Sequence, residues 1–110
     1  MRIQKQSAVT RGWIAGAFTG AMVYTESFEV GLKSGVAHVP EAAHYHTCSY
    51  EHTLILRGEC TIRSVLGVVS ATEGDMITLR PNETAEWDWS TDWATLVIRT
   101  PSITNDKVEI

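Results

Sequence analysis

Short segments of alternating polar and apolar residues, separated by turn residues, constrain the fold of this chain most strongly. Within SFEVGLKSG, the apolar side chains of Phe28, Val30 and Leu32 share one face of an extended strand. Glu29 and Lys33 share the other face. Comparable segments follow at 51–58, 59–71, 75–81, 85–89 and 93–100. Short strands at near-regular spacing, with glycines or polar clusters between them, predict an all-β sandwich or barrel.

Length and charge limit the functions that are open to the chain. Its 110 residues fit one domain over 1–110, which is large enough to bury a core without staples. The net charge is −4 with histidines neutral, and the basic residues are scattered, so we expect no nucleic-acid partner. Cys48 and Cys60 are too few for a disulfide framework, which makes a reducing cytoplasm the expected location.

The stretch GWIAGAFTGAMVY, from Gly12 to Tyr24, contains no charged residue. Its 13 residues are too few to cross a bilayer as a helix. Glycines at 12, 16 and 20 suit turns and strand ends better than the apolar helix of a signal peptide. We therefore expect no membrane partner, and we expect this stretch to contribute strands to the fold.

Three of the four histidines lie in the stretch HYHTCSYEHTLILRG, which runs from His44 to Gly58. His44 and His46 are two residues apart, so a strand places both imidazoles on one face. Glu51 follows after enough residues for a tight turn, and a neighbouring segment can bring its carboxylate to the imidazoles. Two histidines and one carboxylate suit a divalent first-row metal, namely Fe(II), Mn, Ni, Co or Zn. The alternative is a polar strand face without a metal, which leaves Glu51 as a costly inward carboxylate.

Other titratable residues near this stretch have less specific assignments. Cys48 shares strand parity with His44 and His46, so it either reaches the site or is a small buried residue. His52 alternates to the opposite face, where a structural or surface role is expected. His38 is expected in a turn, with the mouth of a pocket as the alternative.

Arginines on the predicted strands are harder to assign. Arg57 shares parity with Glu51, so it either binds an anionic substrate or lies solvated at the turn before Gly58. The pattern does not place Arg80 or Arg99. Cys60 is expected in the core.

The spacing in HYHTCSYEHTLILRG closely resembles the first signature of the cupin superfamily, which reads His-x-His, three or four residues, Glu, six residues and Gly. This resemblance implies a single-domain cupin, an antiparallel jelly-roll β-barrel of two packed sheets with a metal and a small ligand inside. The ending IRTPSITNDK is weakly similar to the tail of small cupins that are associated with sugar and polysaccharide pathways.

The second cupin signature is matched only in part by GDMITLRPNETAEW, from Gly74 to Trp87. The Gly-Asp opening and the proline are present, but the strand between them is one residue longer. Glu83 replaces the second glycine of the signature, and Glu86 occupies the position of the fourth metal ligand, a histidine. The glycine that usually precedes the first signature falls on His38. The resemblance therefore implies His44, His46, Glu51 and Glu86 as the ligand set.

Strand parity makes the role of Glu86 depend on two tryptophans. In a regular strand, Glu86 and Asp88 face one way, and Trp87 and Trp89 face the other. We favour an orientation in which Glu86 points into the barrel, because its position matches that of the cupin ligand. The alternative is that Glu86 points outward and the metal has three protein ligands. The outward tryptophans would then need a partner, which predicts a homodimer with Trp13 and Trp93 as possible neighbours.

Two classes of function follow from the resemblance. The first is a metal-dependent enzyme or binder that acts on a small polar molecule, sugar-derived or a small acid, of the dioxygenase, isomerase or lyase type if it is an enzyme. The second is a non-catalytic ligand-binding cupin without a catalytic metal. A fold does not choose between them, since one fold hosts many functions.

Overall fold

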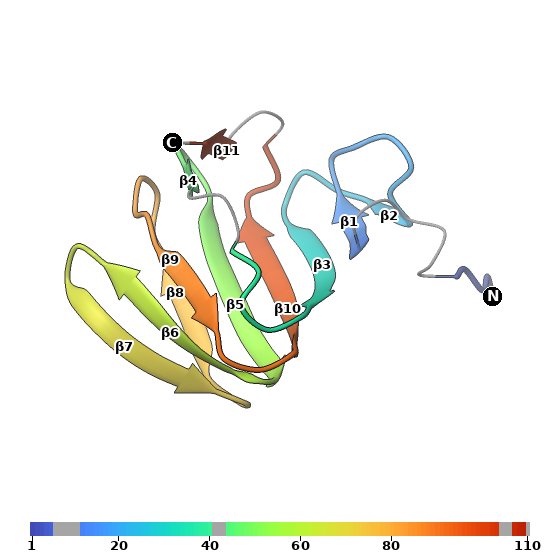
Figure 1. Cartoon of the computed structure of the whole chain (residues 1–110). Helices are drawn as coiled ribbons and strands as arrows, with labels where there is room; N and C mark the ends of the chain where they lie inside the picture. Colours follow the sequence, from blue (N-terminus) through green and yellow to red (C-terminus); the bar gives the residue numbers. More distant parts are fainter. Residues whose placement is uncertain (6–11, 41–43, 104–106, 110) are drawn as a thin grey trace.

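The computed structural model describes residues 1–5, 12–40 and 44–103 and the backbone of 107–109. Strands are the only regular elements longer than a turn in these ranges (Figure 1). They are β1 (Trp13–Gly16), β2 (Val23–Tyr24), β3 (Glu29–Gly35), β4 (His44–His46), β5 (Tyr50–Arg57), β6 (Glu59–Ser64), β7 (Gly67–Thr72), β8 (Met76–Leu79), β9 (Glu86–Trp89), β10 (Trp93–Thr100) and β11 (Lys107–Glu109). No helix in the described ranges is long and apolar enough to cross a membrane.

The strands form a six-stranded sheet, a three-stranded sheet and a small two-stranded pair. The large sheet has the order β2-β1-β3-β10-β5-β8, and the smaller sheet has the order β7-β6-β9. β4 and β11 form the pair that lies at one end of the molecule (Figure 1). All pairings are antiparallel except that of β1 with β2, which is parallel. The expected all-β architecture of two packed sheets is confirmed.

The hydrophobic core lies between the two main sheets. Its buried residues come from β5, β6, β7 and β9, and they are Ile55, Cys60, Ile62, Ala71 and Trp89. Trp89 stacks between Trp87 and Trp93, with ring centroids 5.9 Å and 4.9 Å apart. Cys60 is in the core, as expected, and burial raises the pKa of its thiol to about 11. This aromatic column joins β9 to β10.

The orientation of β9 is opposite to the one that we predicted. Glu86 faces solvent with 69% of its side chain exposed, and it lies 4.0 Å from Arg63 on the neighbouring strand β6. Trp87 and Trp89 face the core instead. The physical reason is the burial of the indoles. Each one removes about 150–250 Å² of surface from water, which stabilises the fold by about 4–6 kcal/mol. An inward carboxylate would lose its hydration.

We predicted a homodimer because two outward tryptophans would need a partner. Since Trp87 and Trp89 face the core, this reason for a dimer no longer applies. The oligomeric state nevertheless stays a prediction. Light scattering at micromolar concentration measures it, since a monomer has a mass of 12.2 kDa and a dimer has twice that mass.

The alternation in β3 is confirmed, and its polar face is the inner one. Glu29 and Lys33 line the interior, whereas Phe28 and Leu32 are 37% and 39% exposed on the outside. Gly31 lies between the two inward charges, and the indole of Trp13 packs directly against its backbone. A Cβ atom at Gly31 would lie 2.8 Å from Cε3 of Trp13, which is closer than real contacts allow. The inner face of β3 therefore has room for an aromatic ring only because residue 31 has no side chain.

We predict that Gly31→Ala destabilises the fold by about 1–3 kcal/mol, because the added methyl group overpacks against Trp13. Ser34→Ala is the matched control, since Ser34 is exposed on the same strand. Its effect should stay within about 0.5 kcal/mol. Urea denaturation followed by fluorescence measures both. Equal stability of the two variants would contradict the packing of Trp13 on β3.

Candidate metal centre

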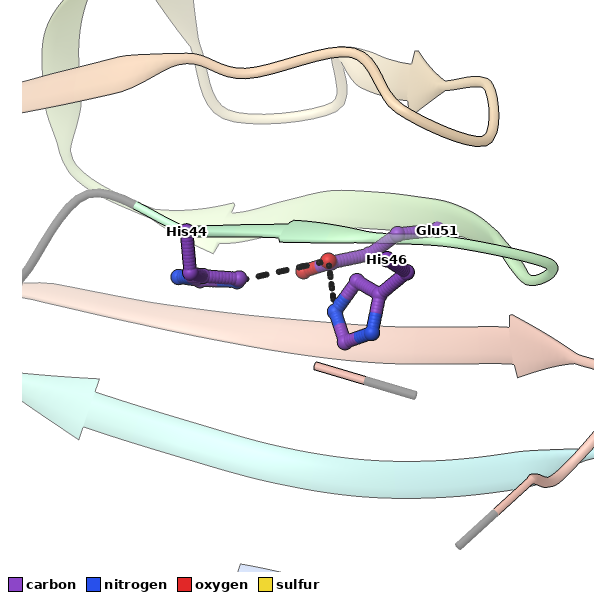
Figure 2. A group of neighbouring side chains, drawn as sticks. All are labelled: His44, His46 and Glu51. Carbon is purple, nitrogen blue, oxygen red and sulfur yellow. Dashed lines mark ion pairs between the residues drawn. The ribbon is translucent and has the colours of Figure 1, made fainter. Parts of the chain in front are cut away.

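Strand β4 places two imidazoles inside the barrel, and the beginning of β5 adds a carboxylate. His44 and His46 alternate past Tyr45, and their rings meet nearly edge to face with centroids 5.3 Å apart. Glu51 points toward both rings (Figure 2). Its Oε2 atom lies 3.1 Å from Nε2 of His46 and 3.7 Å from Nε2 of His44. The structure thus brings together the three residues of the first signature.

Backbone contacts from distant segments hold this arrangement. β4 pairs with β11, whereas β5 pairs with β10 and β8. In the turn between β4 and β5, Ser49 is buried, and its hydroxyl donates to the carbonyl of Pro101 at 2.8 Å. The N–H of Asn82 donates to the carbonyl of His46 at 2.7 Å. The loop of the second signature therefore supports the site through its backbone, although Glu86 does not reach it.

Glu51 is ionised in this environment. Burial by itself would raise the pKa of its carboxyl group, but the adjacent imidazoles of His44 and His46 outweigh burial and hold that pKa well below its usual range. Oε2 of Glu51 is buried and lies 3.1 Å from Nε2 of His46, and among the described residues it has no hydrogen-bond partner. Such a buried acceptor is one that a cation would satisfy.

Arg99 belongs to the site, although the sequence analysis did not place it. On β10 it lies opposite Glu29 of β3 and opposite Glu51 of β5. Its Nη2 atom is 2.8 Å from Oε2 of Glu29, and its Nη1 atom is 3.2 Å from Nδ1 of His46. Ser102 donates to the other oxygen of Glu29 at 3.0 Å. A sequence signal existed, because Arg99 shares strand parity with the apolar Val97 and is therefore directed inward with it.

The donor set of the cluster fits a divalent metal. One donor atom from each of His44, His46 and Glu51 lies within 4.8 Å of the others. Ligands at about 2.1 Å from a metal are separated by roughly 3.0–3.4 Å in octahedral or tetrahedral geometry. The observed separations of 3.1 and 3.7 Å are close to that range. His44, His46 and Glu51 could therefore hold such an ion, without defining which metal it is.

A pocket of about 900 Å³ opens beside the cluster, at the upper end of the usual range for small-molecule sites. Its described charged side chains are Glu29, Lys33, Glu51 and Arg99. Its aromatic side chains are Trp13, Phe18, Trp87, Trp89 and Trp93. The cluster therefore borders a space that is large enough for a ring-containing ligand.

The other candidates from the sequence lie away from the cluster. His52 points to the opposite face of β5, as expected, with Nδ1 2.9 Å from a threonine hydroxyl of β8. His38 is in an exposed turn at φ 60°, and Cys48 is exposed rather than buried or in the site. Arg57 is exposed at the end of β5, and Arg80 pairs with a glutamate three residues further on.

Two acidic residues test the distinction between inner and outer faces. Glu29→Ala should destabilise the protein by about 3 kcal/mol, because it leaves Arg99 as a mostly buried charge without its counter-ion. Glu86→Ala should cost less than about 1 kcal/mol, because its pair with Arg63 is exposed and long. Denaturant unfolding of the two variants provides the comparison. A larger loss for Glu86→Ala than for Glu29→Ala would contradict the orientation of both strands.

No protein-family model matches the chain, and no curated protein matches it in sequence. Solved structures do match. A cupin protein from Bacteroides fragilis superposes with a TM-score of 0.64 and 18% identity over 73% of this chain and 70% of that chain.

The similar structures include enzymes. A nucleoside dehydratase from Streptomyces has a TM-score of 0.69 and 17% identity over 78% of this chain and 70% of that chain. A sugar phosphate isomerase of the cupin superfamily from Silicibacter pomeroyi has a TM-score of 0.59 and 17% identity over 69% of this chain and 52% of that chain. The protein therefore has the cupin fold, as the first signature implied.

Proposed function

We propose that the protein is a metal-binding cupin that binds or transforms a small polar molecule, sugar-derived or a small acid, at His44, His46 and Glu51. The observation that carries this proposal is the convergence of three donor atoms, one of them an ionised buried carboxylate, at the wall of a large pocket. Similar structures that are described as a nucleoside dehydratase and a sugar phosphate isomerase support a small polar substrate.

The residues divide into those that would hold the metal and those that would hold the ligand. His44, His46 and Glu51 would hold a divalent ion, which supplies Lewis acidity or a site for dioxygen when it is bound. Arg99 fixes the ring of His46 from the side and is itself fixed by Glu29. The tryptophans give part of the pocket an apolar lining, which would strengthen polar contacts made beside it.

A metal-free binding protein is the second candidate, and the contact between Arg99 and His46 favours it. Nη1 of Arg99 lies 3.2 Å from Nδ1 and 3.4 Å from Nε2 of His46, and arginine only donates hydrogen bonds. In a neutral His46, one ring nitrogen would therefore accept from Arg99 while the other carries the proton. Metal binding by this imidazole would require the contact with Arg99 or the proton to be displaced.

Metal content distinguishes the two candidates. Protein purified without a metal-chelating column should contain, or take up, one divalent ion per chain when Fe(II), Mn, Ni, Co and Zn are offered. His46→Ala removes one of three ligands and should weaken metal binding by about 100-fold or more. Elemental analysis and calorimetry measure the stoichiometry and the affinity.

His52→Ala is the control for this experiment, because His52 lies on the opposite face of β5. It should bind metal as the unmodified protein does. Full occupancy in His46→Ala would exclude the proposed ligand set. Failure of the unmodified protein to bind any of the five metals would favour the metal-free candidate.

A further inference from the structure

The formal charges of the described acidic and basic residues that line the pocket cancel. Among the described lining residues, Glu29 and Glu51 are acidic, and Lys33 and Arg99 are basic. Glu29 lies 2.8 Å from Arg99, and Glu51 faces the two histidines. A divalent ion at the cluster would therefore leave an excess of two positive charges around the pocket. A cleft with such an excess attracts anions, because its low-dielectric walls screen charge poorly.

Both basic groups contact the indole of Trp13. The ammonium nitrogen of Lys33 lies 4.4 Å from the centroid of the Trp13 ring, and the guanidinium carbon of Arg99 lies 4.3 Å from it. Both contacts are within the range of cation–π interactions, which hold the side chains in place. In the described part of the chain, the buried Nε of Arg99 donates no hydrogen bond. Lys33 and Arg99 are therefore the two described cations available to an acid group in the pocket.

The rest of the pocket is suited to an apolar ring. Phe18, Trp87 and Trp93 line it together with aliphatic side chains such as Leu79. The volume of about 900 Å³ is far more than an acid of two or three carbons fills. Aromatic side chains bind flat rings by offset stacking or edge contacts. The pocket therefore combines one anion-binding end with a larger surface for a planar body.

We infer that the metal-loaded pocket selects a small organic acid with one carboxylate and a flat ring. Lys33 and Arg99 would hold the carboxylate, the ring would lie against the tryptophans, and a metal at His44, His46 and Glu51 would supply further positive charge. This inference rests on the proposed function, because the metal supplies the excess positive charge. It narrows the substrate class from small polar molecules to ring-containing acids. By linkage, the acid and the metal must raise the affinity of the protein for each other by the same factor.

Calorimetry with benzoate, benzamide and acetate tests the inference on the full chain, with and without Ni(II). Benzoate and benzamide share a ring but differ in charge, whereas benzoate and acetate share a carboxylate but differ in the ring. With Ni(II), benzoate should bind about tenfold more tightly than benzamide, the amount expected of a charge-assisted contact. It should also bind about tenfold more tightly than acetate, because of ring burial. Without Ni(II), its preference over benzamide should fall below about threefold.

Lys33→Met keeps the length of the side chain and removes its charge. In the Ni(II)-loaded protein it should weaken benzoate binding by about tenfold and leave benzamide binding unchanged. Arg57→Met is the control, because Arg57 is an exposed cation at the end of β5. Neither substitution should change the Ni(II) stoichiometry, which elemental analysis measures in the same samples.

The outcomes separate this inference from the proposed function. Failure of the unmodified protein to bind Ni(II) or any of the other four metals would overturn both, whereas a different metal among the five that does bind replaces Ni(II) in the comparison. Stoichiometric Ni(II) with equal affinity for benzoate and benzamide would overturn only the inference and leave the metal centre in place. An equal loss of benzoate affinity in Lys33→Met and Arg57→Met would overturn the role of Lys33. If Lys33→Met does not fold, the comparison of the three probes on the unmodified protein decides the question.

Discussion

The ion pair between Arg99 and Glu29 is the interaction on which the arrangement of the site depends. Its two charges are 86–87% removed from solvent, so each has lost most of its hydration. Such a pair persists only when further polar groups satisfy both partners, and here Ser102 binds Glu29 while His46 contacts Arg99. The pair ties β3 to β10, and through His46 it reaches β4, which belongs to another sheet. The orientation of the imidazole is thus set by residues that lie far away in the sequence.

Along the strands of the large sheet, the interior is charged at one end and apolar at the other. Across β3, β10 and β5, one row carries Glu29, Arg99 and Glu51 in register. Further along, the same inner face reaches Ile55 and the stacked tryptophans, which pack against the smaller sheet. Apolar burial at that end stabilises the fold, and it offsets the desolvation of charges at the other end. A jelly roll built in this way can hold a polar site without opening its core to water.

Much of the fold could be read from the sequence, because alternation and turn residues are local signals. The same holds for His44 and His46, whose spacing alone places them on one face. Glu86 could not be placed in this way, since parity offers two solutions and the burial of Trp87 and Trp89 decides between them. Arg99 was missed for another reason. Its parity was visible, but its partners Glu29 and His46 are each more than 50 residues away, and only the register of β10 brings them together.

Two tryptophans pack directly on the backbone of glycines, and this limits how the pocket can change in evolution. Trp13 lies on Gly31, and Trp93 lies on Gly35, where an added Cβ would come within 2.6 Å of the ring. The width of the pocket on the β3 side is therefore set by main chain, which point mutations do not reshape gradually. A larger residue at position 31 or 35 is compatible with the fold only if the facing tryptophan shrinks or moves in compensation. Among related chains, positions 13 and 31, and positions 93 and 35, should therefore change as coupled pairs.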